Sequence, residues 1–198
     1  MARTQAADYD ARRLAIVETA ARLFARDGFR GASMADVADA CKLSKSALYH
    51  YYSAKEDILY DAMHSHIVAL DEAAGAVMAG PGEAKAKLRA LAREFMALYV
   101  GAADRHKVLL NELERLPKSR RAVIVSLQRG LIETVERLLC AIAPGLKQRG
   151  AKRRPAAMLF FGMINWTHTW FDPKGPLSAC ALADMAVDLT LGGLGQAV

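Results

Sequence analysis

The sequence has 198 residues, of which 53% are hydrophobic and 24% are charged, and its formal net charge is +6. This composition is sufficient for a buried core and excludes a disordered polyelectrolyte. No apolar run approaches the roughly 20 residues that cross a bilayer, and the first residues lack the apolar region of a signal peptide, so we expect a cytoplasmic protein. The three cysteines have no metal-binding spacing, and we expect free thiols, no metal and no cofactor.

Positive charge is concentrated in residues 105–154, which hold thirteen Lys or Arg residues against four Asp or Glu residues. Residues 1–55 hold nine against six. Charge alone therefore does not locate a nucleic-acid surface. The small excess of positive charge in residues 1–55 also disfavours a structural DNA-binding protein, which would need basic charge across its whole DNA face.

The first helix is predicted to begin at Asp10, after a loose arm at residues 1–9. Its apolar residues recur at helical spacing from Leu14 to Phe24. Gly28 is expected to end this helix, because glycine adopts a positive φ at a helix end at little cost.

Two short helices follow, and each is opened by a serine that can cap its first turn, Ser33 in one and Ser44 in the other. In the second of them, Leu48 and Tyr52 are four residues apart and share a face, so we expect both to pack inward. The other side chains of this stretch end in polar groups that can reach a phosphate or a base, namely Lys45, Ser46, Tyr49, His50 and Tyr51. This pattern is typical of a short helix that reads DNA.

Six further helices are predicted in the rest of the chain, and no segment alternates like a strand. The clearest break is Gly80-Pro81-Gly82, and the basic run KQRGAKRR is expected to form a loop before Pro155 opens a helix. The predicted ranges are 54–79, 83–103, 105–116, 117–141, 155–171 and 178–192, the last with Ser178 as its N-cap. The predicted fold class is all-α, with about nine helices and no internal repeat.

The segment from Ile16 to Leu59 resembles the DNA-binding domain of the TetR family of bacterial one-component regulators. The resemblance rests on Ala-Ala-x-x-Leu-Phe-Ala, Gly-Phe, Ser-Met, Leu-Ser-Lys, Leu-Tyr-His-Tyr-Tyr and Lys-Glu, spaced as in IVETAARLFARDGFRGASMADVADACKLSKSALYHYYSAKEDIL. The sequence departs from the family at Lys42, where glycine is usual, and a left-handed backbone there would cost about 1 kcal/mol. The resemblance implies a helix-turn-helix DNA-binding domain at residues 1–53 and an effector-binding and dimerisation domain at residues 54–198.

The resemblance also implies roles for single residues of the first domain. The DNA contacts that it implies are Tyr49 and Tyr51 at phosphates, His50 in the groove, Lys45 and Ser46 at bases, and Ser33 and Lys55 at the backbone. Two of these residues have other interpretations. Tyr49 could pack under the first helix, and Lys55 could pair with Asp57 or Glu56.

TetR-like proteins are homodimers, and the resemblance implies that the last two helices pair with those of a second subunit. Two recognition helices would then read an inverted-repeat operator. A small-molecule effector would release the DNA by binding the released conformation more tightly, so that the protein acts as a repressor. The candidate interface residues on the last helix are Leu182, Met185, Ala186 and Leu189, which could instead pack within their own subunit.

Two later segments, NELERLPKSRRAVIV and GMINWTHTWFDPKGPLS, resemble TetR-type regulators of acyl-CoA catabolism, which control the degradation of fatty acids, phenylacetate or steroid side chains. This second resemblance implies an acyl-CoA thioester as effector. Residues that could hold the phosphates of coenzyme A are Arg115, Lys118, Arg120 and Arg121, or Lys147, Arg149, Lys152, Arg153 and Arg154. Candidate lining for the acyl group is Phe95, Tyr99, Asn111, Asn165 and Trp166.

Other interpretations of these effector candidates stay open. Asn165 and Trp166 could be interface or core groups, and the basic loop could be solvated surface. Arginine–carboxylate pairs are also possible, of Arg120 and Arg121 with Glu112 and Glu114. The alternative function is a repressor of a multidrug efflux gene, released by hydrophobic drug-like ligands. An enzyme is disfavoured, because no HExxH, GxSxG or phosphate-loop motif occurs.

Overall fold

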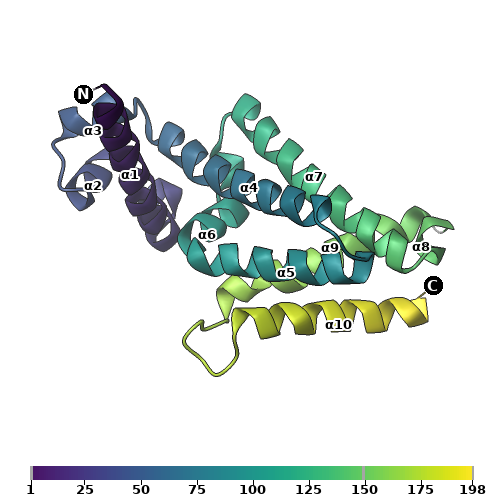
Figure 1. Cartoon of the computed structure of the whole chain (residues 1–198). Coiled ribbons are helices and arrows are strands. Elements are labelled where there is room, and N and C mark those ends of the chain that lie inside the picture. The colour runs from purple at the N-terminus through teal and green to yellow at the C-terminus, as the bar shows by residue number, and fades with distance from the viewer. Residues whose placement is uncertain (1, 149, 198) are drawn as a thin grey trace. The chain divides into compact units, whose positions relative to one another are not determined.

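A computed structural model describes residues 2–148 and 150–197 of the chain (Figure 1). All regular structure in these residues is helical, which confirms the predicted all-α class. The α-helices are α1 (Ala2–Gly31), α2 (Met34–Ala40), α3 (Lys45–Tyr51), α4 (Lys55–Ala79), α5 (Ala84–Gly101), α6 (Ala103–Asn111), α7 (Lys118–Ile142), α8 (Gly145–Gln148), α9 (Gly150–Trp166) and α10 (Ala179–Ala197). Two 3₁₀ turns, η1 (Leu113–Arg115) and η2 (Thr167–Thr169), complete the described elements.

The chain folds into two compact units. The first unit combines the chain up to His66 with Asp104–Ile124, and the second combines Ile67–Ala103 with the chain from Val125 onward. Helices α4 and α7 each contribute residues to both units. The functional boundary after residue 53 stays a prediction.

Helix α1 begins at Ala2, so the prediction of a loose arm at residues 1–9 is wrong. The arm has a tertiary partner, because the ring of Tyr9 stacks on the ring of Tyr51 with 4.8 Å between their centroids. Contacts of this kind, more than local propensity, stabilise the end turns of a helix in water. At the other end, Gly28 has φ 75° and ψ 157°, a conformation open almost only to glycine, and it interrupts α1 where predicted.

The helix-turn-helix segment forms as its capping residues predict. Ser33 and Asp36 form a capping box at the start of α2, and the hydroxyl of Ser44 accepts the N–H of Ala47 at 3.1 Å at the start of α3. Lys42, in the turn between these helices, has φ 57°. This left-handed residue therefore carries the cost of about 1 kcal/mol that a side chain meets in this conformation.

The second unit is built on α5, which lies beside α10 (Figure 1). Two arginines of α5 hold α10 by ion pairs with its carboxylates. Arg93 forms a bidentate pair with Asp184, at 2.8 and 2.6 Å, and Arg89 contacts Asp188 at 2.5 Å. Behind these pairs, Phe95 of α5 is fully buried, with 6.0 Å between its ring centroid and that of Phe161 in α9.

Helix α9 differs from its predicted range at both ends. It begins at Gly150, so the predicted basic loop is helical where it is described, and Pro155 lies inside the helix. Arg153 and Arg154 explain the difference, because they reach the buried carboxylate of Glu136 in α7 at 2.8 and 3.4 Å. The side chain of Lys147 and all of Arg149 lie outside the described residues.

The end of α9 at Trp166 falls short of the predicted Phe171. Two side chains that follow it donate hydrogen bonds to carbonyls of the last turn. The hydroxyl of Thr167 donates to the carbonyl of Ile164 at 2.6 Å, and that of Thr169 donates to the carbonyl of Trp166 at 2.8 Å. Carbonyls that a further turn of helix would bind are therefore already satisfied.

Candidate nucleic-acid interface

Helix α3 separates its side chains as its spacing predicts. Leu48 is fully buried and Tyr52 is 3% exposed, so both face the core of the first unit. Tyr49 is 53% exposed, which rules out the interpretation that it packs under α1. The other predicted DNA contacts of this helix are exposed at Lys45, Ser46 and His50, and half-buried at Tyr51. The outer face of α3 therefore carries hydroxyl, ammonium and imidazole groups that can donate hydrogen bonds to DNA.

Ser33 is exposed, but its hydroxyl already has two partners. It accepts the N–H of Asp36 at 3.2 Å and donates to the Asp36 carboxylate at 2.7 Å. The hydrogen bonds from Ser33 lower the pKa of Asp36, so this carboxyl stays ionised. A DNA phosphate at the start of α2 would meet that negative charge. The structure thus gives Ser33 a capping role, and its contact with DNA stays a prediction.

Lys55 is turned toward the end of α1. Its ammonium donates to the carbonyls of Phe29 and Ala32 at 2.8 and 2.9 Å and lies 4.3 Å from the centroid of the Phe29 ring. A cation is favourable where helix carbonyls end. The predicted alternative pairing with Asp57 or Glu56 is replaced by these contacts. A phosphate contact of Lys55 stays a prediction, and only its third N–H is left for one.

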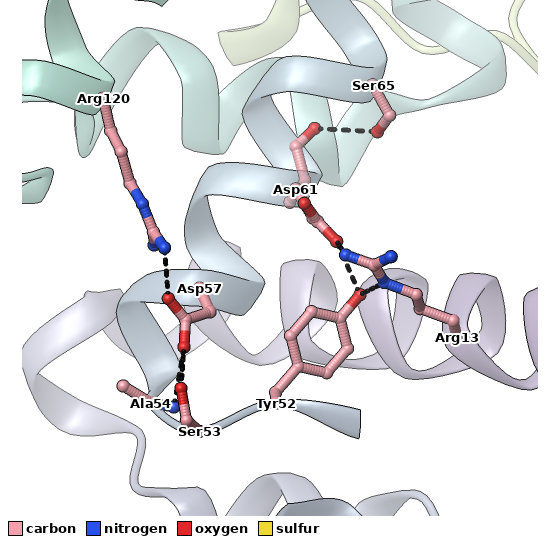
Figure 2. A network of polar contacts seen from close by, with 9 residues as sticks. Arg13, Tyr52, Ser53, Ala54, Asp57, Asp61, Ser65 and Arg120 are labelled. Carbon is pink, nitrogen blue, oxygen red and sulfur yellow. Dashed lines mark hydrogen bonds and ion pairs between the residues drawn. The ribbon is translucent and has the colours of Figure 1, made fainter. Parts of the chain in front are cut away.

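The residue after α3 joins two other helices in a polar network (Figure 2). The hydroxyl of Tyr52 donates to the carboxylate of Asp61 in α4 at 2.8 Å and accepts from Nε of Arg13 in α1 at 3.0 Å. Arg13 also pairs with Asp61 at 2.5 Å. Burial, together with the Asp61 carboxylate, raises the pKa of Tyr52, so this hydroxyl stays protonated and can donate. These contacts fix the end of α3 against α1 and α4.

A second carboxylate on α4, one turn before Asp61, binds the start of α7. Asp57 accepts the hydroxyl of Ser53 at 2.7 Å and the N–H of Ala54 at 2.9 Å, and it pairs with Arg120 at 2.5 Å (Figure 2). These contacts, the hydrogen bond from Ser53 first, lower the pKa of Asp57. The guanidinium of Arg120 also lies 5.2 Å from the ring centroid of Tyr60.

Sequence reasoning missed Arg13, Asp57 and Asp61. The spacing of the two aspartates at i and i+4 on α4 was a signal that both lie on one helix face. Their partners Arg13 and Arg120 come from other helices that are distant in the sequence, so the pairing itself is visible only in the fold.

The predicted effector residues are divided between the two units. The first unit holds Asn111, Arg115, Arg120 and Arg121, and the second holds Phe95, Tyr99, Asn165 and Trp166. In the first unit Asn111 is exposed, Arg115 contacts Glu112 at 3.4 Å, and Arg121 pairs with Glu114 as the alternative interpretation predicted. Arg120 pairs with Asp57 instead of a glutamate. These arginines therefore have carboxylate partners in the structure.

In the second unit, Phe95 and Tyr99 are buried and stacked, with 6.2 Å between their ring centroids. Burial raises the pKa of Tyr99. Asn165 is half-buried, and its side-chain carbonyl oxygen is buried without a hydrogen-bond partner among the described residues. Trp166 beside it is 65% exposed. The structure therefore brings Phe95 and Tyr99 together and places Trp166 on a surface.

The predicted interface residues of α10 divide into two pairs. Leu182 and Ala186 are buried within the subunit, whereas Met185 and Leu189 are 50% and 63% exposed. The exposed pair borders an open, mainly apolar groove of about 520 Å³ between α9 and α10. Its lining includes Met158, Leu159, Met163, Trp166, Trp170, Met185 and Leu189.

Two family models of known proteins match most of the chain. A family model described as "Bacterial regulatory proteins, tetR family" matches residues 16–62, and one described as "Tetracyclin repressor-like, C-terminal domain" matches residues 81–194. The chain belongs to the TetR family. It is accordingly a DNA-binding transcriptional regulator, and α3 is the second helix of its helix-turn-helix, the position of the recognition helix in this motif.

Several known proteins are similar to this one over nearly the whole chain. A TetR-family regulator from Bordetella parapertussis 12822 is 39% identical with a TM-score of 0.88, over 90% of this chain and 93% of that one. AibR, solved in complex with isovaleryl coenzyme A and operator DNA, is 29% identical with a TM-score of 0.76, over 90% and 97%. The HTH-type transcriptional repressor KstR2 of Rhodococcus jostii is 22% identical over 92% of this chain and 91% of its own length.

None of the helices in the described part of this TetR-family chain is long and apolar enough to cross a membrane. Three or more His, Cys, Asp or Glu side chains do not gather anywhere among the described residues in a way that could hold a metal ion.

Proposed function

We propose that the chain is a homodimeric repressor that binds an inverted-repeat operator through α3 and is released by an acyl-CoA thioester. The observation that carries the DNA-binding part is the division of α3. Leu48 and Tyr52 anchor one face, and the opposite face presents Lys45, Ser46, Tyr49 and His50. Ser33, Tyr51 and Lys55 complete the proposed DNA surface, with Ser33 and Lys55 also fixing the helices that carry it.

The proposed dimer forms through α9 and α10. Their exposed apolar groove contains Trp166, Trp170, Met185 and Leu189, and a monomeric protein rarely exposes such a continuous patch. A two-fold axis at this groove would bury the same residues of both subunits. It would also present two copies of α3 to two half-sites of the operator.

The proposed effector class rests on relatives. AibR, 29% identical to this chain, was solved with isovaleryl coenzyme A and operator DNA. The fatty acid metabolism regulator protein of Bacillus subtilis is 23% identical over 90% of the chain. In this chain the acyl group would bind within the second unit, among Phe95, Tyr99 and Asn165.

A titration tests the effector class. The protein is bound to a fluorescent duplex that it has selected from a random library, and isovaleryl-CoA, longer acyl-CoA thioesters, free coenzyme A and a hydrophobic drug-like cation are added in turn. We expect a thioester to release the DNA at a concentration at which free coenzyme A does not. Release by the cation alone would replace this proposal with a repressor of a multidrug efflux gene.

A further inference from the structure

The first turns of α1 bring a third ring to the two aromatic residues at the end of α3. The ring of Tyr9 stacks on that of Tyr51 at 4.8 Å and 25°, and it meets the ring of His50 edge-on at 6.5 Å and 88°. His50 and Tyr51 also meet edge-on, at 5.7 Å and 81°. Each ring therefore contacts the other two, and two of the three belong to the recognition helix.

Tyr9 acts on the same end of α3 as Arg13. These residues are four apart in α1 and share a helix face. Arg13 holds Tyr52 by a hydrogen bond at 3.0 Å, while Tyr9 stacks on Tyr51, the residue before it. Tyr52 is buried in that network, but Tyr51 is only half-buried, so its ring orientation depends on what packs against it.

A side chain that is held in one orientation before binding loses less conformational entropy when it meets its partner. We propose that Tyr9 is a positioning residue for operator binding, whose ring holds His50 and Tyr51 in the orientation in which they meet DNA. This inference rests on the proposed function, in which α3 reads the operator. It extends the DNA-reading machinery to the first turns of α1, far upstream of the recognition helix in the sequence.

Operator affinity of Tyr9 variants tests the proposal, with a duplex selected by the wild-type protein as the probe. Loss of an aromatic pair changes an equilibrium constant by about two- to tenfold, and the proposed dimer has two DNA-binding domains. We therefore expect Tyr9→Ala to weaken operator binding by about tenfold. Tyr9→Phe keeps the ring and should bind like wild type. Leu14→Ala, which removes another exposed apolar side chain from α1, is the matched control and should also bind like wild type.

Two further measurements separate positioning from other roles. Tyr9 makes no phosphate contact in this scheme, so Tyr9→Ala should leave the slope of affinity against salt concentration unchanged. In a Tyr51→Ala background, Tyr9→Ala should weaken operator binding by much less than about tenfold, because the ring on which Tyr9 stacks is absent. Wild-type affinity in Tyr9→Ala, an equal loss in Tyr9→Phe, or additive losses would overturn the inference. A wild-type protein that selects no duplex would overturn the proposed function and this inference with it.

Discussion

At the scale of single residues, the position of a side chain on α3 decides what it can do. Tyr49 is 53% exposed and neighbours a fully buried Leu48, so its hydroxyl is free of the core. We expect Tyr49→Phe to weaken operator binding by about tenfold, since a hydroxyl–phosphate hydrogen bond contributes about 1 kcal/mol or more in each head. Fluorescence anisotropy measures the loss, and urea unfolding should show an unchanged fold. Unaltered affinity would remove Tyr49 from the interface.

Another residue-scale prediction concerns the buried His66 of α4. Its Nε2 lies 3.2 Å from Nδ1 of His106, and burial, followed by the charge of Arg105, lowers the pKa of His66 to about 4. The folded pKa is below the unfolded value, so the unfolded chain takes up a proton first as the pH falls. The stabilising effect of neutral His66 is therefore present above pH 6.5 and is lost between about pH 6.5 and 4.

We expect the free energy of unfolding to fall by about 2 kcal/mol through His66 between pH 8 and pH 5. Urea unfolding of the wild type and of His66→Gln at pH 8 and pH 5 measures the contribution of His66. The carboxylates that also titrate in this range are present in both proteins, so their effect cancels in the comparison. The wild type should lose more stability than the variant by that same amount. Equal losses in the two proteins would show that His66 is not held neutral.

At the scale of elements, Asp57 does two things at once, since it caps α4 and binds α7. An N-terminal cap contributes about 1 kcal/mol, whereas a partly exposed ion pair contributes less. We therefore expect Asp57→Ala to lower the free energy of unfolding by about 1–2 kcal/mol and Arg120→Ala by less than about 1 kcal/mol. The double variant should be no less stable than Asp57→Ala, because both changes remove one pair. Additive losses in urea unfolding would show that Arg120 stabilises mainly through Tyr60.

Elements whose ends depend on neighbouring residues could be predicted from the sequence. Ser33 and Ser44 cap α2 and α3, Ser178 accepts the N–H of Ala181 at 3.1 Å, and Gly28 interrupts α1. Elements whose ends depend on distant contacts could not. The start of α1 packs Tyr9 on α3, and the start of α9 joins Glu136, and neither partner is near in the sequence.

The candidate site follows the same division. Helical periodicity predicts that Leu48 and Tyr52 face inward and that Tyr49 faces outward. It does not predict the role of Lys55, because its carbonyl partners are Phe29 in α1 and Ala32 just after it, and α2 and α3 lie between these residues and Lys55 in the sequence. The exposed fraction of Trp166 likewise depends on how α9 packs, so the sequence left its effector and interface roles open.

At the scale of the whole molecule, the two units are joined by helices that belong to both. Helix α4 begins beside the recognition helix with Asp57 and Asp61 and continues into the second unit beyond His66. Helix α7 begins with Arg120, which binds Asp57, and continues past Ile124. A ligand that shifts either helix in the second unit would therefore act on residues that hold α3. The proposed release by an effector would require one of these helices to have two arrangements.

The proposed dimer belongs to the scale of the whole molecule, and a variant of Leu189 tests it. This residue is 63% exposed on α10, within the apolar groove, and a second subunit would bury it. A carboxylate there would lose its hydration on association, at a cost of several kcal/mol for each copy. We therefore expect Leu189→Glu to shift the wild-type dimer to a monomer in sedimentation equilibrium. Operator affinity should fall with it, because each half-site would then be bound independently.

The matched control is Leu14→Glu, which places the same charge on a leucine that is 49% exposed on α1. It should remain dimeric, because α1 lies outside the proposed interface. A monomeric wild type would contradict the dimer itself. A dimeric Leu189→Glu would instead move the interface away from the groove of α9 and α10, and Trp166 and Trp170 would then need another partner to explain their exposure. The pair of variants thus separates the existence of the dimer from its location.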